Sequence, residues 1–221
     1  MSSLTIKNLN KIYNPGKNEV HAVKDFNLEI EDGEFVALLG PSGCGKTSTL
    51  RMIVGLESIT SGSILFDAVE INHLSPEQRN VAMAFESYAL YPNFTIFENL
   101  AFPLEVKKNS SSEISKKVGD IAEMLQITNI LELKPNQLSG GQQQRVSLGR
   151  ALIRDPAVFI LDEVKSHLDA HLNFQMLFEL KKIHQTLKKT MIYVTHDQME
   201  ALALSDRVAV MANAVLQQFG D

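Results

Sequence analysis

Short apolar segments, separated by polar turns and by stretches of helical periodicity, organise this chain. Phe26-Asn27-Leu28-Glu29-Ile30 alternates strictly between apolar and polar residues, which predicts a strand with one solvated face. Leu4-Thr5-Ile6 predicts an earlier strand. The turn at residues 31–34 leads into the apolar run 35–39, which is typical of a strand buried on both faces. Similar buried strands are predicted at residues 81–85, 158–161, 191–194 and 208–211.

Two amphipathic helices are predicted between these strands, and both apolar stripes are interpreted as core-packing faces. The first contains Ile114, Val118, Ile121 and Leu125, with Ser110 and Glu113 in capping-box register, and the second contains Leu172, Met176, Leu180, Ile183 and Leu187. Strands that alternate with helices predict an α/β fold with a mainly parallel sheet. The strand-poor interval from residue 87 to residue 154 predicts a helical insertion within one large domain.

The residues after the strand at 35–39 carry the first candidate chemistry. Gly40-Pro41-Ser42-Gly43-Cys44-Gly45-Lys46-Thr47 matches the G-x-x-x-x-G-K-[ST] pattern of a phosphate-binding loop, and an apolar helical segment follows it. The glycines allow backbone N–H groups to face a phosphate, Lys46 supplies a cation, and the helix N-terminus adds its dipole. Thr47 is placed to bind Mg²⁺ through its hydroxyl, whereas Cys44 is a spacer. The chain is therefore predicted to bind a nucleoside triphosphate.

Composition narrows the class of protein. The chain has 221 residues, of which 44% are hydrophobic, and a net charge of −5 that argues against general nucleic-acid binding. Its single cysteine excludes an internal disulfide and a cysteine-rich zinc site. The first residues lack the charged start and apolar core of a signal peptide, and no apolar stretch approaches the ~20 residues that cross a bilayer. We expect a cytosolic location, with any membrane role depending on a partner.

Two further motifs add carboxylates and a second anion site. The strand at 158–161 ends in Asp162 and Glu163, a costly pair unless a cation or catalysis requires the charge there. Asp162 suits Mg²⁺, usually through water, and Glu163 suits proton abstraction from an attacking water. In Leu138-Ser139-Gly140-Gly141-Gln142, two glycines expose the backbone where a helix begins. This arrangement predicts a second anion site.

Together these motifs resemble the nucleotide-binding subunit of an ABC transporter along essentially the whole chain. Residues 40–47 match Walker A, residues 138–142 match the signature, and Asp162-Glu163 matches the end of Walker B. The resemblance places residues 166–169 at the D-loop, His196 at the switch histidine, and Tyr13 at the aromatic position that stacks on adenine. It implies a P-loop NTPase fold of the ABC ATPase type, with a RecA-like core, an N-terminal antiparallel β part and a helical subdomain. The core and β part would comprise residues 1–86 and 155–221, and the helical subdomain would comprise residues 87–154.

The resemblance also implies roles for the site residues. Lys46, Glu163 and His196 would be catalytic, and Thr47, Glu86 and Asp162 would bind Mg²⁺. ATP would contact Tyr13, the loop residues Gly40, Pro41, Ser42, Gly43, Cys44, Gly45, Lys46, Thr47 and Ser48, and the signature residues Ser139, Gly140, Gly141 and Gln142. Two copies of the chain would stack head to tail, so that the signature of one covers the ATP held by the other. Opening and closing of this pair would drive membrane permease subunits served by a substrate-binding protein, which would place the chain in the cytoplasm on the inner face of the cell membrane.

Within the family, residues 87–92, 98–102 and 193–198 are most similar to the ATPases of carbohydrate importers of the maltose type, with polyamine and sulfate importer ATPases as close relatives. The chain also departs from the family pattern. Glu86 replaces the usual Q-loop glutamine, Val164-Lys165 replaces Pro-Leu, His167 replaces an asparagine, and Ala68 and Ala214 stand where turn glycines are common. The sequence stops at Asp221, where such importer ATPases usually continue into a β-rich regulatory domain.

These features leave three functions open. The first is an ATP-hydrolysing motor subunit of an importer, with carbohydrate as the expected substrate. The second is a nucleotide-binding regulatory subunit whose hydrolysis is impaired by the departures from the family pattern. The third is an ABC ATPase that acts on DNA or ribosomes, although the coiled-coil insertions or paired ATPase domains usual in such proteins are not visible here. The effect of Glu86 also stays open, because its carboxylate can either bind Mg²⁺ or repel a γ-phosphate oxygen.

Overall fold

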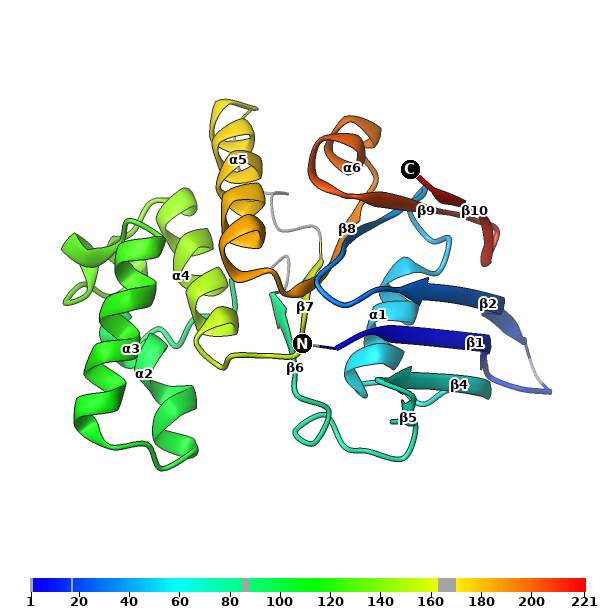
Figure 1. The fold of residues 1–221 in the computed structure, drawn as a ribbon, viewed down its shortest axis with the longest axis horizontal. Helices are drawn as coiled ribbons and strands as arrows, with labels where there is room; N and C mark the ends of the chain where they lie inside the picture. Colours follow the sequence, from blue (N-terminus) through cyan, green and yellow to red (C-terminus); the bar gives the residue numbers. More distant parts are fainter. Residues whose placement is uncertain (1, 17, 85–87, 163–169) are drawn as a thin grey trace. The chain divides into compact units, whose positions relative to one another are not determined.

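A computed structural model describes residues 2–16, 18–84, 88–162 and 170–221, of which residues 170–175 are described by their backbone only. The chain divides into two compact units. We call Met1–Met83, Ala157–Asp162 and Leu180–Asp221 the sheet unit, and Ala84–Pro156 with Glu163–Glu179 the helical unit (Figure 1). The sheet unit is therefore assembled from three separate stretches of sequence.

The sheet unit contains two sheets. The first is antiparallel, in the order β2-β1-β4-β5, and comprises β1 Leu4–Tyr13, β2 Val20–Ile30, β4 Ser61–Phe66 and β5 Val69–Glu70. The second has the order β10-β9-β3-β8-β7-β6, and comprises β3 Phe35–Leu39, β6 Val81–Ala84, β7 Val158–Asp162, β8 Thr190–Thr195, β9 Arg207–Ala212 and β10 Val215–Gly220. Strands β3, β7, β8 and β9 run parallel, and β10 pairs antiparallel with β9. The predicted α/β fold, with a mainly parallel core and an N-terminal antiparallel part, is confirmed.

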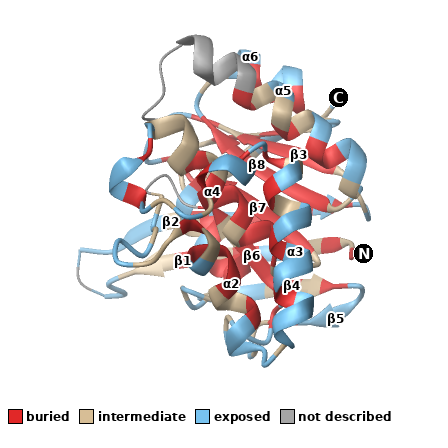
Figure 2. Cartoon of the chain, turned by 90° about the vertical axis from the view of Figure 1, so that its left-hand side faces the viewer, coloured by how far each residue is buried: buried red, intermediate tan, exposed pale blue. Residues whose placement is uncertain are grey.

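The central strands of the parallel sheet are buried on both faces. Every residue of β8 is buried, and β3 and β7 are buried up to their last residue (Figure 2). This burial explains why these strands are continuous apolar runs in the sequence. In β2, by contrast, Phe26, Leu28 and Ile30 are buried while Asn27 and Glu29 are exposed, so the predicted alternation is confirmed.

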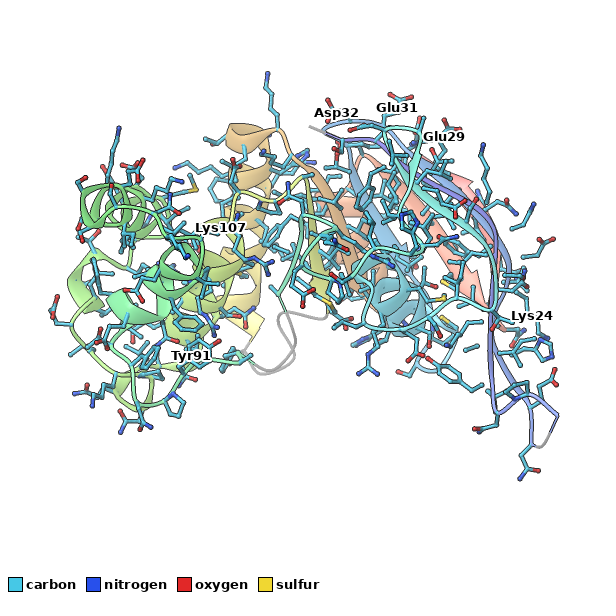
Figure 3. All side chains as sticks on the ribbon, turned by 90° about the horizontal axis from the view of Figure 1, so that it is seen from below. Lys24, Glu29, Glu31, Asp32, Tyr91 and Lys107 are labelled. Carbon is cyan, nitrogen blue, oxygen red and sulfur yellow. The ribbon has the colours of Figure 1, made fainter. Side chains whose placement is uncertain are left out.

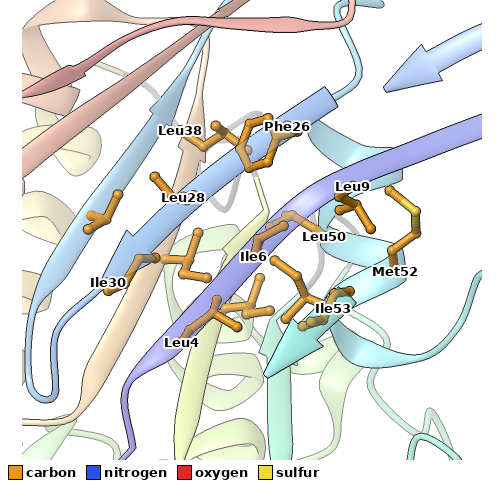
Figure 4. Close-up of a cluster of buried hydrophobic side chains, with 14 of the residues drawn as sticks. Leu4, Ile6, Leu9, Phe26, Leu28, Ile30, Leu38, Leu50, Met52 and Ile53 are labelled. Carbon is orange, nitrogen blue, oxygen red and sulfur yellow. The ribbon is translucent and has the colours of Figure 1, made fainter. Parts of the chain in front are cut away.

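The core of the sheet unit joins the antiparallel sheet to the phosphate-loop helix. Side chains from β1, β2, β3 and helix α1 (Lys46–Val54) pack together in one cluster (Figure 4). Leu50, Met52 and Ile53 of α1 are almost completely buried in it. Burial of each such side chain stabilises the fold by about 1.5–3 kcal/mol. The helix that follows the loop is thus held in place by its own apolar face.

The helical unit contains α2 (Ile96–Val106), α3 (Ser111–Met124), α4 (Gly140–Leu152), two short 3-10 helices (Thr128–Ile130 and Pro135–Gln137), and the start of α5 (Ala170–Leu187).

In α3, Ser110 and Glu113 form the predicted capping box, with the Ser110 N–H donating to Glu113 Oε2 at 2.9 Å. The stripe predicted for this helix is largely buried, and only Ile121 is partly exposed. In α5, Met176, Leu180 and Ile183 are buried, whereas Leu187 is partly exposed and the side chain of Leu172 is not described. Helix α6 (Gln198–Leu204) belongs to the sheet unit.

Two hairpin turns hold alanine in the left-handed region. Ala68, between β4 and β5, has φ 66°, and Ala214, between β9 and β10, has φ 68°. The residues before them, Asp67 and Asn213, also have positive φ, as the central pair of a type I′ turn requires. These are the two positions where the sequence has alanine in place of a common turn glycine. Each alanine carries a conformational cost of roughly 1–2 kcal/mol that a glycine would avoid.

Candidate nucleotide-binding site

The predicted phosphate loop lies between β3 and α1, as its sequence context requires. Strand β3 ends at Leu39, and α1 begins at Lys46 with Gly45 as its N-cap, at φ 107°. Among the described side chains, none caps this helix. The backbone N–H groups of its first turn and its dipole therefore favour an anion at this end.

Lys46 reaches back across the loop from the start of α1. Its side chain is buried, with the residue 4% exposed, and Nζ donates to the carbonyl oxygens of Gly40 at 2.7 Å and Pro41 at 3.0 Å. A lysine ammonium has three donors, so these carbonyls engage two of them. The cation thus lies at the beginning of the loop, beside the N–H groups that favour an anion.

Asp162 and His196, the predicted switch histidine, lie at the same sheet edge as the loop. Strand β8 lies between β3 and β7, with Thr195 opposite Leu39 on one side and Val194 opposite Asp162 on the other. Because all three strands are parallel, their carboxyl ends share one edge. His196 is the exposed residue that follows β8. The loop, the Walker B aspartate and the histidine are brought together by strand order and register alone.

Buried hydroxyl and carboxylate groups fix the segment on either side of His196. The Tyr193 and Thr195 hydroxyls each donate to Glu200 Oε2 at 2.7 Å, and Glu200 is 2% exposed. Thr195 Oγ1 also accepts from the Asp197 N–H at 3.0 Å, and the Asp197 side chain caps α6. The residues before and after His196 are therefore held by one hydrogen-bonded network. Sequence reasoning missed Glu200, although the capping aspartate before a short helix was a signal for it.

The donor set near the loop fits Mg²⁺ that is bound together with ATP. Among the described residues, no cluster of three His, Cys, Asp or Glu side chains is arranged to hold a metal ion. Thr47 is exposed in the first turn of α1, and Asp162 lies at the shared sheet edge. Hydroxyl and carboxylate oxygens are ligands that Mg²⁺ prefers, and phosphate oxygens usually supply part of its shell. Two predicted residues, Glu86 and Glu163, lie outside the described residues, as do the D-loop positions 166–169 and the substituted Val164-Lys165.

The signature segment forms the N-terminus of α4 in the helical unit. Ser139 is the N-cap, its N–H donates to Gln142 Oε1 at 2.9 Å, and its hydroxyl accepts from the Gln142 N–H at 3.4 Å. Gly140 and Gly141 occupy the first turn and are partly exposed. This N-terminus can present backbone N–H groups to an anion, as the sequence predicts.

Two arginines of α4 anchor the helix within the helical unit. Arg145 pairs with Glu179 and donates to the Leu125 carbonyl at 3.3 Å. Arg150 donates to the Ala89 carbonyl and lies 4.3 Å from the ring centroid of Tyr91, which is labelled in Figure 3. Burial lowers the pKa of the Arg150 guanidinium. Sequence reasoning singled out neither arginine.

Tyr13 lies at the end of β1, within reach of α1. Its hydroxyl donates to Ser48 Oγ at 3.4 Å, and the Lys11 ammonium lies 4.7 Å from its ring centroid. Lys11 is a buried cation that sequence reasoning missed, because lysines on a strand are usually solvated. The aromatic residue expected to stack on adenine is thus tied to the helix that carries Lys46 and Thr47.

The chain was compared with known proteins and families. The family model described as ABC transporter matches residues 23–166. The trehalose import ATP-binding protein SugC of Mycobacterium tuberculosis is 49% identical over 220 residues, which cover 100% of this chain and 55% of SugC. The sn-glycerol-3-phosphate import ATP-binding protein UgpC of Psychromonas ingrahamii is 48% identical over 220 residues, which cover 100% of this chain and 58% of UgpC. The chain spans only part of the length of these curated relatives, 55% of SugC and 58% of UgpC.

A solved structure is similar over nearly the whole chain. It is a dimeric structure of the ATP-binding cassette MJ0796 in a post-hydrolysis state, bound to ADP and Pi. It has a TM-score of 0.85 and 32% sequence identity, and the similarity covers 99% of this chain and 98% of that chain. None of the helices in the described part of this chain is long and apolar enough to cross a membrane. Fold, motifs and relatives agree, and the chain belongs to the ABC transporter ATP-binding family.

Proposed function

We propose that the chain is the ATP-binding and ATP-hydrolysing subunit of an ABC importer. The observation that carries this proposal is the shared sheet edge, where the strand register gathers the phosphate loop, Asp162 and His196. A nucleotide held by the loop at this edge would have its terminal phosphate near a metal-binding carboxylate and a histidine. That arrangement suits phosphoryl transfer, in which positioning and electrostatic stabilisation supply most of the catalysis.

The predicted catalytic and metal-binding residues each have a role in the proposed reaction. Lys46 neutralises the β- and γ-phosphate oxygens. Thr47 and Asp162 would hold Mg²⁺, which would supply positive charge to offset the negative charge that develops on the phosphates. Glu163, as general base, accepts a proton from the attacking water. The new bond joins the water oxygen to the γ-phosphorus, the bridging bond to ADP breaks, and His196 contacts the γ-phosphate. Glu86 would complete the metal site in place of the usual glutamine.

The site would be completed by a second copy of the chain. In the proposed pair, Ser139, Gly140 and Gly141 of one copy face the γ-phosphate of the ATP that the other copy holds. The partly exposed N-terminus of α4 supports this role, and the similar cassette MJ0796 is described as dimeric. ATP favours the closed pair because only that state contacts it from both sides, and hydrolysis removes this preference.

The transported substrate is proposed from the relatives. SugC is named for trehalose import and UgpC for sn-glycerol-3-phosphate import. We propose a carbohydrate or a polyol phosphate as substrate, delivered by a binding protein to membrane permease subunits. The chain would then lie on the cytoplasmic face of the membrane through those subunits. Polyamine and sulfate remain the alternative substrates.

Replacing the proposed general base tests hydrolysis. Glu163→Gln should lower steady-state ATPase by about 100-fold or more while ATP binding is retained, because the amide cannot accept a proton. Glu123→Gln is the matched control, since Glu123 is exposed on α3 and is assigned no role in the site. Equal rates for wild type and Glu163→Gln, both well above the background without protein, would refute the role of Glu163.

A second candidate function is a nucleotide-binding regulatory subunit that hydrolyses ATP very slowly. Glu86 in place of glutamine, and Val164-Lys165 directly after the catalytic carboxylate, favour this candidate. It predicts wild-type turnover no faster than that of Glu163→Gln. If the Glu86 carboxylate slows hydrolysis by repelling the γ-phosphate, Glu86→Gln should raise the steady-state rate. An unchanged or lower rate in Glu86→Gln would exclude that explanation.

A further inference from the structure

We propose that Lys11 is a positioning residue that fixes the ring of Tyr13 for contact with the nucleotide base. The inference deepens the proposed function, because it rests on Tyr13 stacking against adenine. It concerns β1, the start of α1 and the turn that follows α1, all within the sheet unit. The resemblance and the sequence motifs assign Lys11 no role.

Lys11 is held firmly in a buried position. The residue is 5% exposed, and Nζ donates to Glu57 Oε1 and to the Ser58 carbonyl, each at 2.7 Å. The hydrogen bond from Lys11 lowers the pKa of the Glu57 carboxyl, so this carboxylate is ionised at neutral pH. Glu57 is itself fixed, because its N–H donates to the Arg51 carbonyl at the end of α1. The Lys11 ammonium is therefore fixed in one position, unlike that of an exposed lysine, which samples many rotamers in water.

The same ammonium lies 4.7 Å from the ring centroid of Tyr13. A cation at this distance is attracted to the negative face of an aromatic ring. The Tyr13 hydroxyl makes a further contact, because it donates to Ser48 Oγ at 3.4 Å. The ring is thus tied to the first turn of α1 through Ser48 and to the turn after α1 through Lys11 and Glu57.

Two tethers at opposite ends of α1 fix where the ring lies relative to the phosphate loop. The loop and α1 hold the phosphates, so the distance from phosphate to base is set before a nucleotide binds. With Lys11 on one face of the ring, a base is directed to the other face. This preorganisation lowers the cost of ordering the aromatic side chain on binding, and it acts only on ligands that carry a base.

The test compares a ligand with a base and one without. Lys11→Met keeps the apolar stem and removes the cation, so the dissociation constant for ATP should rise about three- to tenfold. The dissociation constant for tripolyphosphate should stay within about twofold of wild type, because the loop and Lys46 are untouched. Lys7→Met is the matched control, since Lys7 is exposed on the same strand and should leave both constants unchanged. Equal weakening of ATP and tripolyphosphate would overturn the proposal and indicate a general structural defect.

A double-mutant cycle separates this inference from the proposed role of Tyr13. Tyr13→Ala should weaken ATP binding, and adding Lys11→Met to Tyr13→Ala should then have no further effect. If Tyr13→Ala leaves ATP binding unchanged, Tyr13 does not stack on the base and the inference falls with it. If Tyr13→Ala weakens ATP binding but Lys11→Met does not, the inference about Lys11 is wrong while the role of Tyr13 stands. The same holds if Lys11→Met weakens ATP binding by the same factor in the wild type and in Tyr13→Ala. If Lys11→Met fails to fold, Glu57→Gln is the substitute, because it weakens the contact that holds the Lys11 ammonium. Glu57→Gln should raise the dissociation constant for ATP about two- to fivefold and leave that for tripolyphosphate unchanged. No change in the dissociation constant for ATP would overturn the proposal.

Discussion

Gly45 occupies the most constrained position in the phosphate loop, and its replacement by alanine tests how that constraint supports the site. Its φ is 107°, which L-residues rarely adopt at a cost of roughly 1–2 kcal/mol or more. An added Cβ would lie 2.2 Å from the carbonyl oxygen of Ala22 in β2 and 3.3 Å from Met211 Cε. Backbone must shift to relieve such a contact, which adds about 1–3 kcal/mol. Gly45→Ala should therefore lower the free energy of unfolding by about 2–5 kcal/mol.

Gly43 provides the matched control in the same loop. Its φ is 78°, but no described atom lies within 4 Å of the position that a Cβ would take. Gly43→Ala should cost only about 1–2 kcal/mol, from backbone conformation alone. Urea unfolding of both variants measures the difference. ATP binding is a second readout, and Gly45→Ala should lose affinity because Gly45 is the N-cap of α1. Equal losses of stability in the two variants would refute the argument from the Ala22 contact.

Three further predictions follow from contacts elsewhere in the sheet unit. Arg79→Met should lower the free energy of unfolding by about 3 kcal/mol, measured by urea unfolding, because the buried Arg79 guanidinium donates to four backbone carbonyls, two of them at the C-terminal end of α1. Ala68→Gly should raise the thermal midpoint, with a gain of about 0.5–1 kcal/mol, since this exposed alanine has φ 66°; a lower midpoint would contradict the assigned turn strain. Lys11 lowers the pKa of Glu57 below 4.5, so this pair contributes stability above pH 4.5 that is lost as the pH falls through the folded pKa. NMR titration should therefore find the Glu57 pKa closer to 4.5 in Lys11→Met than in wild type.

Local patterns predicted the buried strands and the helix caps well. The apolar runs became β3, β6, β7, β8 and β9. Strand β8 is buried throughout, and β3 and β7 are buried up to their last residue, which requires continuous hydrophobic residues. In β9, by contrast, Val208 and Val210 are partly exposed, so the burial predicted for this strand is only partial. The capping box at Ser110 and Glu113 also formed as predicted, since its hydrogen bonds span only three residues. The capping box depends on nearby residues alone, and a buried strand shows its burial in its own run of apolar residues, so the sequence was sufficient for both features.

Three strands with weak apolar patterns, β4, β5 and β10, were missed. Strand β4 begins with Ser61-Gly62-Ser63, β5 has two residues, and β10 contains Gln217-Gln218, so none shows a strong apolar pattern. Each of these strands pairs in a hairpin, and the positive φ of the turn residues becomes visible only in the structure. Strands β1 and β2 are also longer than the predicted segments, because their pairing with each other extends through polar residues.

The residues of the candidate site also fall into two groups, those that sequence motifs predicted and those that only the structure revealed. Sequence motifs predicted the loop, Asp162, His196 and the signature as site residues, and the structure adds how strand register brings the first three to one edge. Lys11 had no motif, because its partners Glu57 and Ser58 are brought close to it by the tertiary fold. Glu200 bonds to residues only five and seven positions away, and its one sequence signal was the capping aspartate at the start of its helix. A buried charge of this kind is recognised by the oxygen atoms around it rather than by its sequence neighbours.

The position of β3 in its sheet has a consequence for synthesis of the chain. Strand β3, which leads into the phosphate loop, pairs with β8 and β9, whose residues lie more than 150 positions later. While the ribosome is still translating the helical unit, the strand that carries the loop has neither of these neighbours, and an apolar segment of five residues stays without its native partners. Nascent chains shorter than about 212 residues, in which β9 is incomplete, should therefore bind no nucleotide. Before β9 is synthesised, protection of the apolar β3 segment from aggregation depends on chaperones or on the antiparallel sheet.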